Sequence, residues 1–300
     1  MTRPVALQYR QTHKRAKWKD EMVQALQAID RLADIAGAYG AIFCDVWGVV
    51  HDGEARNPPA VAALAEARRA GAHVVLLTNS PRPAEGVREQ LDALGVSRDS
   101  YDAIVTSGDA TRALISAGSR RVFHIGTERN EDLFEGLGLE LLPPEEADLV
   151  VATGLFDDER ETPDDYVALL DRMAARNLPM ICANPDIVVH RGERLIYCAG
   201  AVARAYAERG QVVHLAGKPH PPIYDVASSL LPKAGVPILC IGDGMFTDVK
   251  GANTFGADCL FISDGIHRDE LADANGDPAR LAEALDGRGL TARFVQPFLR

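Results

Sequence analysis

Residues 41–48, AIFCDVWG, form a short apolar run that ends in a carboxylate, Asp45, and a glycine turn. The pattern returns at residues 237–244, PILCIGDG, where an apolar run delivers Asp243 to a second glycine turn. Short continuous apolar runs of this kind are typical of strands buried in a parallel sheet. Open α/β sheets bind their ligands at the carboxyl ends of such strands. We therefore expect Asp45 and Asp243 to lie together at a ligand site.

The residues between these two runs indicate the ligand. Two adjacent carboxylates repel each other unless a positive charge lies between them, and a hard cation such as Mg²⁺ takes oxygen ligands of this kind. A third apolar run ends at Thr78 and Asn79, which add a hydroxyl and an amide, and Lys218 stands in the short segment Gly217-Lys218-Pro219. Together these groups predict a site for a phosphoryl group and a divalent cation.

The composition describes a globular protein of one large or two modest domains, with 300 residues of which 47% are hydrophobic. The net charge of -11 argues against a general surface for nucleic acid or for an anionic membrane. The five cysteines stand mostly inside apolar runs, as buried thiols do, and we expect them to be reduced in a cytoplasmic protein. No apolar run reaches the roughly 18–20 residues of a membrane span.

Strand and helix patterns alternate along the chain, which predicts a doubly wound parallel sheet. Helical spacing over residues 21–38 predicts a helix that leads into the first strand. The site motifs pause over the middle of the chain, which indicates an inserted second domain. We expect an N-terminal extension at 1–25, the first part of the core domain at 26–118, the inserted domain at 119–211 and the second part of the core domain at 212–300.

Other phosphate and hydrolase motifs do not fit. The segment before Lys218 lacks the first glycine of a P-loop, and the residue after the lysine is Pro219 where a P-loop has Ser or Thr. No Gly-x-Gly-x-x-Gly follows the first strand, and neither Gly-x-Ser-x-Gly nor His-Glu-x-x-His occurs.

Taken in order, the motifs resemble those of the haloacid dehalogenase (HAD) superfamily, class IIA, which includes NagD-type and pyridoxal phosphate phosphatases. The four matching segments are Asp45-Val46-Trp47-Gly48-Val49-Val50, Leu77-Thr78-Asn79, Gly217-Lys218-Pro219, and Gly242-Asp243 with Thr247-Asp248. The resemblance covers the chain from about Asp30 onward. It implies a Rossmann-like core with an inserted α/β cap domain of the C2 type, and it places Ala183-Asn184-Pro185-Asp186 in the cap's substrate loop.

The resemblance also implies a role for each matching residue. Asp45 would be the nucleophile that takes the phosphoryl group, and Lys218 would neutralise the charge that the nucleophile shares with the phosphate. The substrate would be held by Thr78, Asn79, Lys218, Asn184 and Asp186. Mg²⁺ would be bound by Asp45, the backbone carbonyl of Trp47, Asp243 and Asp248. A homodimer formed through the cap is common among class IIA relatives.

One position departs from the family pattern. Trp47 stands where family phosphatases carry a second Asp, which protonates the leaving oxygen and later activates water. An indole can do neither, which could cost on the order of 10²–10⁴ in rate. Three interpretations stay open: His51 or Asp52 supplies the proton, the leaving group needs no acid, or the protein binds a phosphorylated metabolite without turning it over.

The sequence thus favours a cytoplasmic, Mg²⁺-dependent phosphatase that acts on a small phosphorylated metabolite, such as a sugar, nucleotide or cofactor phosphate, through an aspartyl phosphate, with His51 as a further catalytic residue. The alternative is a catalytically impaired phospholigand-binding or sensor protein that retains the site. A metal-free dehalogenase is disfavoured because Asp243, Asp248 and Thr78 would then lack a role.

Overall fold

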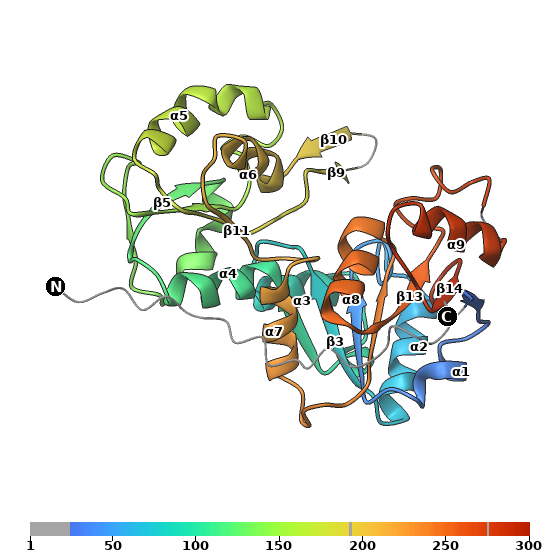
Figure 1. Cartoon of the computed structure of the whole chain (residues 1–300). Coiled ribbons are helices and arrows are strands. Elements are labelled where there is room, and N and C mark those ends of the chain that lie inside the picture. The colour runs from blue at the N-terminus through green and yellow to red at the C-terminus, as the bar shows by residue number, and fades with distance from the viewer. Residues whose placement is uncertain (1–24, 192–193, 275) are drawn as a thin grey trace.

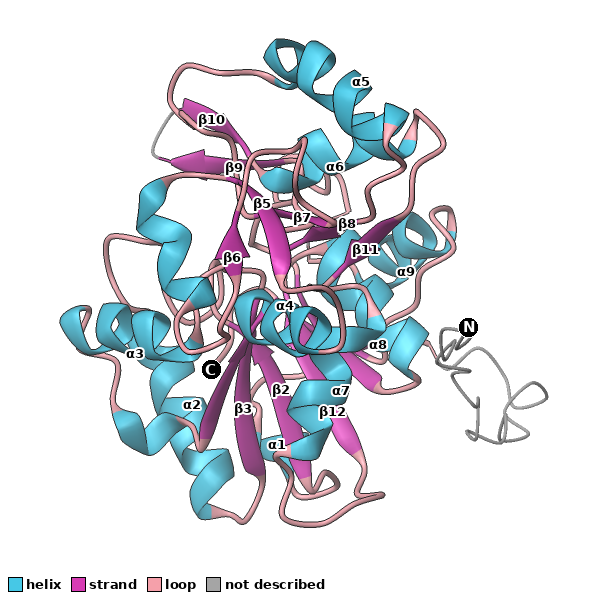
Figure 2. Cartoon of the chain, turned by 90° about the vertical axis from the view of Figure 1, so that its left-hand side faces the viewer, coloured by secondary structure: helices cyan, strands magenta, loops and turns pink. Residues whose placement is uncertain are grey.

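The computed structural model describes residues 25–191, 194–274 and 276–300. Its larger sheet has seven strands, every neighbouring pair of which is parallel. In spatial order they are β1 (Gln27–Ala28), β14 (Phe294–Gln296), β13 (Asp258–Ile262), β12 (Ile238–Gly242), β2 (Ala41–Asp45), β3 (His73–Thr78) and β4 (Ala103–Thr106). Figure 2 shows β3, β2 and β12 side by side in the lower part of the molecule, below the strands of a second sheet.

Helices cover both faces of this sheet. Along β2, the side chains of Ile42 and Cys44 belong to one apolar cluster and that of Phe43 belongs to another. Both faces of the strand are therefore buried, which explains why its sequence is a continuous apolar run. The helices are α1 (Ala33–Ala36), α2 (Pro58–Arg69), α3 (Ala84–Ala93), α4 (Ser107–Ser116), α7 (Pro221–Ser229), α8 (Lys250–Phe255) and α9 (Pro278–Asp286). The predicted doubly wound sheet is confirmed.

A second parallel sheet lies between the two halves of the first in sequence. Its five strands, in spatial order, are β11 (Val213–Leu215), β8 (Met180–Cys182), β7 (Leu149–Ala152), β5 (Arg121–Ile125) and β6 (Glu140–Leu141). Helices α5 (Val167–Ala175) and α6 (Ala199–Ala207) and an antiparallel hairpin of β9 (Val188–Arg191) and β10 (Arg194–Tyr197) complete this unit. We call residues 121–215 the cap and the rest of the described chain the core; Figure 1 shows the cap above one end of the core sheet.

Short helical turns join several of these elements. The 3-10 turns are η1 (Arg98–Ser100), η2 (Glu128–Phe134) and η3 (Pro163–Tyr166), and a π-helical turn, η4 (Met245–Val249), follows β12. Turn η4 carries one of the predicted metal ligands, Asp248.

The structure differs from the sequence-based expectation in two segments. The helix predicted over residues 21–38 is wrong in its described part, which holds strand β1 and the single turn α1. The apolar residues there do not share one face, because Leu26 packs in one core cluster while Ile29 and Leu32 pack in the other. Residues from 212 were expected in the core domain, yet β11 pairs with β8 of the cap sheet. The extension predicted at 1–25 lies almost entirely outside the described residues.

Two further expectations concern the cysteines and the membrane. Cys44, Cys182, Cys198, Cys240 and Cys259 are all free and buried, as their apolar surroundings in the sequence predict. Among the described residues, no helix combines the length and the apolar character that crossing a membrane requires.

Candidate active site

The strand order brings the sequence motifs to one edge of the core sheet. β2 lies between β3 and β12, so the carboxyl ends of these three strands are adjacent. Asp45 is the last residue of β2, Thr78 is the last residue of β3, and Asp243 follows the last residue of β12. The predicted meeting of Asp45 and Asp243 is therefore what the topology produces.

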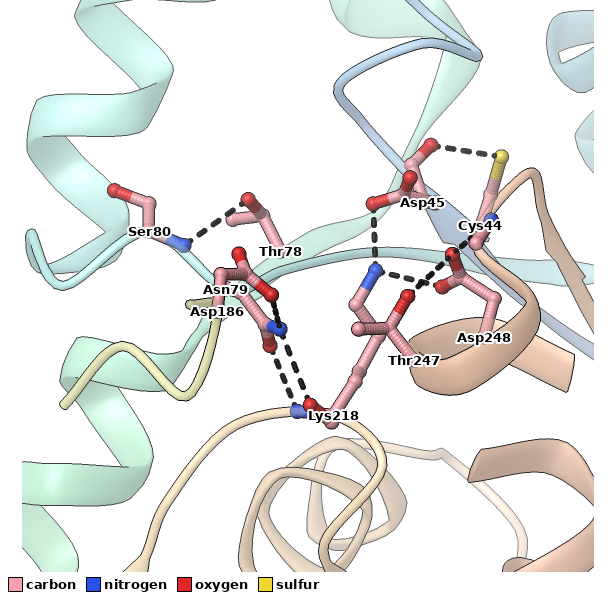
Figure 3. Close-up of polar contacts among 10 residues, drawn as sticks. Cys44, Asp45, Thr78, Asn79, Ser80, Asp186, Lys218, Thr247 and Asp248 are labelled. Carbon is pink, nitrogen blue, oxygen red and sulfur yellow. Dashed lines mark hydrogen bonds and ion pairs between the residues drawn. The ribbon is translucent and has the colours of Figure 1, made fainter. Parts of the chain in front are cut away.

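A buried lysine links two of the carboxylates. Lys218 Nζ lies 2.6 Å from Asp45 Oδ1 and 2.7 Å from Asp248 Oδ1, and Figure 3 shows its ammonium group between them. All three side chains are buried. A second oxygen of Asp248 accepts the backbone N–H of Gly244 at 3.1 Å, which holds the carboxylate against the start of η4. The ammonium group therefore fixes the orientation of both carboxylates.

The geometry fits a divalent cation. Carboxylate oxygens of Asp45, Asp243 and Asp248 lie within 4.8 Å of one another. Two glycines crowd Asp243: a Cβ atom would lie 2.3 Å from its Oδ2 at Gly48, where φ is +86°, and 2.1 Å from it at Gly265. The backbone at Gly48 and Gly265 therefore packs directly against the Asp243 carboxylate, and any larger residue at either position would displace it. Oxygen ligands in this number and spacing suit a hard cation such as Mg²⁺.

The electrostatics also call for more positive charge. Burial, then the carboxylate of Asp248, raise the pKa of Asp45 well above its usual range, against the opposing effect of Lys218. Burial and Asp248 raise the pKa of Asp243 to about 6. Burial alone would lower the pKa of Lys218, but the carboxylates of Asp248 and Asp45 outweigh it and raise that pKa. One ammonium group among three carboxylates leaves an excess of negative charge that a dication would offset.

The amide of Asn79 connects the core to the cap. Its Nδ2 donates to Asp186 Oδ1 of the cap at 3.0 Å and to the backbone carbonyl of Lys218 at 3.1 Å, while its Oδ1 accepts the Lys218 N–H at 2.7 Å. Figure 3 shows this network beside the lysine. The backbone N–H of Asp186 in turn donates to Asn184 Oδ1 at 3.1 Å. The side chain of Asn79 therefore holds the cap loop on the core.

Core and cap enclose one cavity of about 470 Å³. Ten of the eleven residues named for the site from the sequence line it, Asp52 being the exception: Asp45, Trp47, His51, Thr78, Asn79, Asn184, Asp186, Lys218, Asp243 and Asp248. Trp47 contributes a side chain that is half exposed, and it packs edge-on against His51 with ring centroids 5.1 Å apart. The structure therefore brings the predicted residues together; their chemical roles stay proposals.

His51 and Asp52, the two predicted proton donors, are not equivalent. His51 is 3% exposed, and its Nδ1 accepts the backbone N–H of Gly53 at 2.9 Å. Burial lowers the pKa of this imidazole, against a small opposing effect of Asp52. Asp52 is exposed, does not line the cavity, and closes its own turn by accepting the N–H groups of Glu54 and Ala55. The turn role accounts for Asp52, so His51 is the one of the two that faces the cavity.

The structure adds cavity residues that the sequence analysis did not select. Phe246 and His267 line the wall beside Asp243, and Thr127, Asn130 and Thr153 line it from the cap. The rule of strand ends could have found His267, because it follows the apolar run of β13 and the glycine at 265. No signal in the sequence singles out the three cap residues, which become neighbours only when η2 folds against β7.

Comparisons with known proteins agree with this geometry. Residues 42–140 match a family model described as haloacid dehalogenase-like hydrolase, and residues 215–287 match a HAD-hydrolase-like model. A crystal structure of a haloacid dehalogenase-like hydrolase from Brucella suis is 49% identical, with a TM-score of 0.80; the match covers 91% of this chain and all of that one.

Two more distant relatives carry names. A 4-nitrophenylphosphatase structure from Thermotoga maritima is 26% identical, with a TM-score of 0.66, over 88% of this chain and 96% of that one. An acid sugar phosphatase of Staphylococcus haemolyticus is 25% identical over 69% of this chain and 78% of its own length. The first family model covers the first part of the core and continues into the cap as far as β6, and the second begins at the last residue of the cap and covers most of the second part of the core. This chain belongs to the haloacid dehalogenase-like hydrolase family.

Proposed function

We propose that this protein is a divalent cation-dependent phosphatase, with Mg²⁺ as the cation, that hydrolyses phosphomonoesters of small metabolites through an aspartyl phosphate on Asp45. The observation that carries the proposal is the buried group of Asp45, Asp243, Asp248 and Lys218 in the cavity between core and cap. The names of two relatives, an acid sugar phosphatase and a 4-nitrophenylphosphatase, support the same class of reaction.

In the first step, a carboxylate oxygen of Asp45 attacks the phosphorus atom and the bond from phosphorus to the leaving oxygen breaks. Lys218, at 2.6 Å, orients the nucleophile and offsets the negative charge of the approaching phosphate. The hydroxyl of Thr78 and the backbone N–H of Asn79 hold phosphoryl oxygens. Asp45, Asp243, Asp248 and the Trp47 carbonyl would hold the cation, which when bound supplies charge neutralisation between the two reacting anions.

In the second step, water attacks the phosphorus atom of the aspartyl phosphate and releases inorganic phosphate. The cap limits access of bulk water to this intermediate, because the loop of Asn184 and Asp186 is hydrogen-bonded to Asn79 on the core. The neutral imidazole of His51 has its proton on Nε2, since Nδ1 accepts the N–H of Gly53. We propose that this Nε2–H group is a hydrogen-bond donor to the bound substrate.

The test is phosphate release from a panel of sugar, nucleotide and cofactor phosphates with Mg²⁺ and with EDTA. Asp45→Asn should abolish turnover, while Asp286→Asn, an exposed carboxylate at the end of α9, should leave it unchanged. A phosphoenzyme trapped on Asp45 and cleaved by hydroxylamine would support the intermediate. Turnover that survives in Asp45→Asn would refute the proposal, and folded protein that binds ligand without turnover would favour the sensor.

A further inference from the structure

The family's acid/base position is occupied by Trp47, and the structure limits what can replace it. An imidazolium at His51 would carry a proton on Nδ1, which would then face the N–H of Gly53 at 2.9 Å, donor against donor. His51 is therefore built to stay neutral, and a neutral imidazole is a weak acid. Asp52 does not line the cavity. Neither of the residues proposed from the sequence is thus suited to protonate a leaving oxygen.

A different histidine stands on the cavity wall. His267 lines the cavity on the loop that follows β13, directly after Ile266, whose backbone N–H donates to Asp243 Oδ2 at 2.9 Å. Its ring packs edge-on against Phe246, another lining residue, with centroids 6.0 Å apart and an interplanar angle of 79°. The imidazole is therefore held beside the acidic group that takes the phosphoryl end of a substrate.

A carboxylate sets which ring nitrogen of His267 carries a proton. Its Nδ1 lies 3.0 Å from Glu270 Oε2, and the other oxygen of Glu270 accepts a hydrogen bond from Arg288. Hydrogen bonds from Arg288 and then from His267 lower the pKa of Glu270, so this carboxylate is ionised and accepts the proton on Nδ1. The second ring nitrogen, Nε2, then remains for proton exchange with a substrate, as in other imidazole-carboxylate pairs.

We propose that His267, held by Glu270, is the acid/base residue that Trp47 cannot be. This proposal rests on the phosphatase function proposed above. In the first step the leaving oxygen takes the Nε2 proton of the His267 imidazolium as its bond to phosphorus breaks. In the second step the neutral imidazole takes a proton from water as the water oxygen bonds to phosphorus, and the bond to Asp45 breaks.

Charged and apolar groups surround His267. Glu270 and Arg288 contact it from one side as an ion pair, the acidic group at Asp243 lies beyond Ile266, and Phe246 adds an apolar wall. The side chain of Glu270 is 44% exposed, so its contact with His267 adds little to the stability of the fold. A purely structural role therefore explains the His267–Glu270 contact poorly.

The experiment compares two esters that differ in their need for an acid. Glycerol phosphate leaves as an alkoxide and needs a proton, whereas 4-nitrophenyl phosphate leaves as a stable phenolate. His267→Gln should lower kcat/KM for glycerol phosphate by roughly 10²–10³ and for 4-nitrophenyl phosphate by less than about 5-fold. The control is His214→Gln, an exposed histidine of β11 that does not line the cavity, which should change neither.

A second variant tests the positioning residue. Glu270→Gln keeps the size of the side chain and removes the carboxylate that contacts Nδ1 of His267 at 3.0 Å. The basic limb of the profile of kcat/KM against pH for glycerol phosphate should then move to lower pH, a change that a structural role would not produce. Circular dichroism and thermal melts confirm that both variants fold.

The outcomes separate the two proposals. Equal loss on both esters in His267→Gln, or no loss on glycerol phosphate, would overturn the assignment of His267 and leave the phosphatase intact. Loss confined to glycerol phosphate, with the shifted limb in Glu270→Gln, would establish it. No hydrolysis of either ester by the unaltered protein would overturn the phosphatase and, with it, the role of His267.

Discussion

Replacing Lys218 by Met tests whether the buried ammonium group holds the active site together. Lys218→Met keeps an unbranched side chain but removes the charge that Asp45 and Asp248 contact at 2.6 and 2.7 Å. Both carboxylates are buried, with 8% and 5% of their surfaces exposed. Removing one partner of a buried ion pair costs about 3–5 kcal/mol, because the remaining charges are left without compensation. Two lost hydrogen bonds to charged groups, at about 1.5–3 kcal/mol each, lead to the same range.

The assay is thermal unfolding in EDTA. At about 2.1 cal/mol/K of unfolding entropy per residue, each kcal/mol lowers the melting temperature of a 300-residue chain by about 1.6 °C, so Lys218→Met should melt roughly 5–8 °C below the unaltered protein. Mg²⁺ should restore part of the loss, because a dication takes over the neutralisation of the three carboxylates. Lys250→Met, an exposed lysine of α8, is the matched control and should melt within about 2 °C of the unaltered protein. If Lys218→Met melts with the control in EDTA, the ammonium group does not hold the carboxylates together and the reasoning fails.

Three further changes test other parts of the structure. Asn79→Asp places a carboxylate against Asp186, so the cap should open and become more sensitive to limited proteolysis; an unchanged digestion pattern would contradict this. Gly265→Ala would put a Cβ atom 2.1 Å from Asp243 Oδ2 and so displace that carboxylate. The affinity for Mg²⁺, measured by calorimetry, should fall at least about 10-fold while the cap and core still fold. An unaltered affinity would count against the metal site. Burial lowers the pKa of His124 to about 4, below its value in the unfolded chain, so the unfolded chain binds more protons between about pH 6.5 and 4. The free energy of unfolding should therefore fall by up to ~3 kcal/mol as the pH falls through that window. Denaturant titrations of His124→Phe should lack this part of the pH dependence, and a dependence identical to that of the unaltered protein would refute the reasoning.

The sequence-based prediction of the fold succeeded where secondary structure is encoded in consecutive residues or in a pattern that repeats along the chain. The apolar runs at β2, β3 and β12 are buried on both faces, so their strand character is written in consecutive residues. It failed between residues 25 and 38, where apolar residues at helical spacing belong to two core clusters on opposite faces of the sheet. Spacing cannot say which cluster receives a side chain, because that depends on strands more than 200 residues away.

For the site, the residue types and their order were sufficient to select Asp45, Thr78 and Asp243, because parallel strands bring their carboxyl ends to one edge whatever lies between them. Their partners were less accessible. The amide of Asn79, for example, forms hydrogen bonds with the cap loop and with the backbone of Lys218. Its partners lie 107 and 139 residues away in the sequence, so the sequence could not identify them.

The sequence by itself thus determined the sheet, the inserted cap and the residues that meet at the strand ends, since each depends on short patterns of apolar, glycine and acidic residues. Only the tertiary structure decided how the charged groups pair, which ring nitrogen of His51 accepts a hydrogen bond, and that the imidazole of His267 contacts the carboxylate of Glu270 on the cavity wall. These properties depend on distances of a few ångströms between loops that are far apart in the chain, and such distances exist only after the strands have aligned and the cap has closed over them.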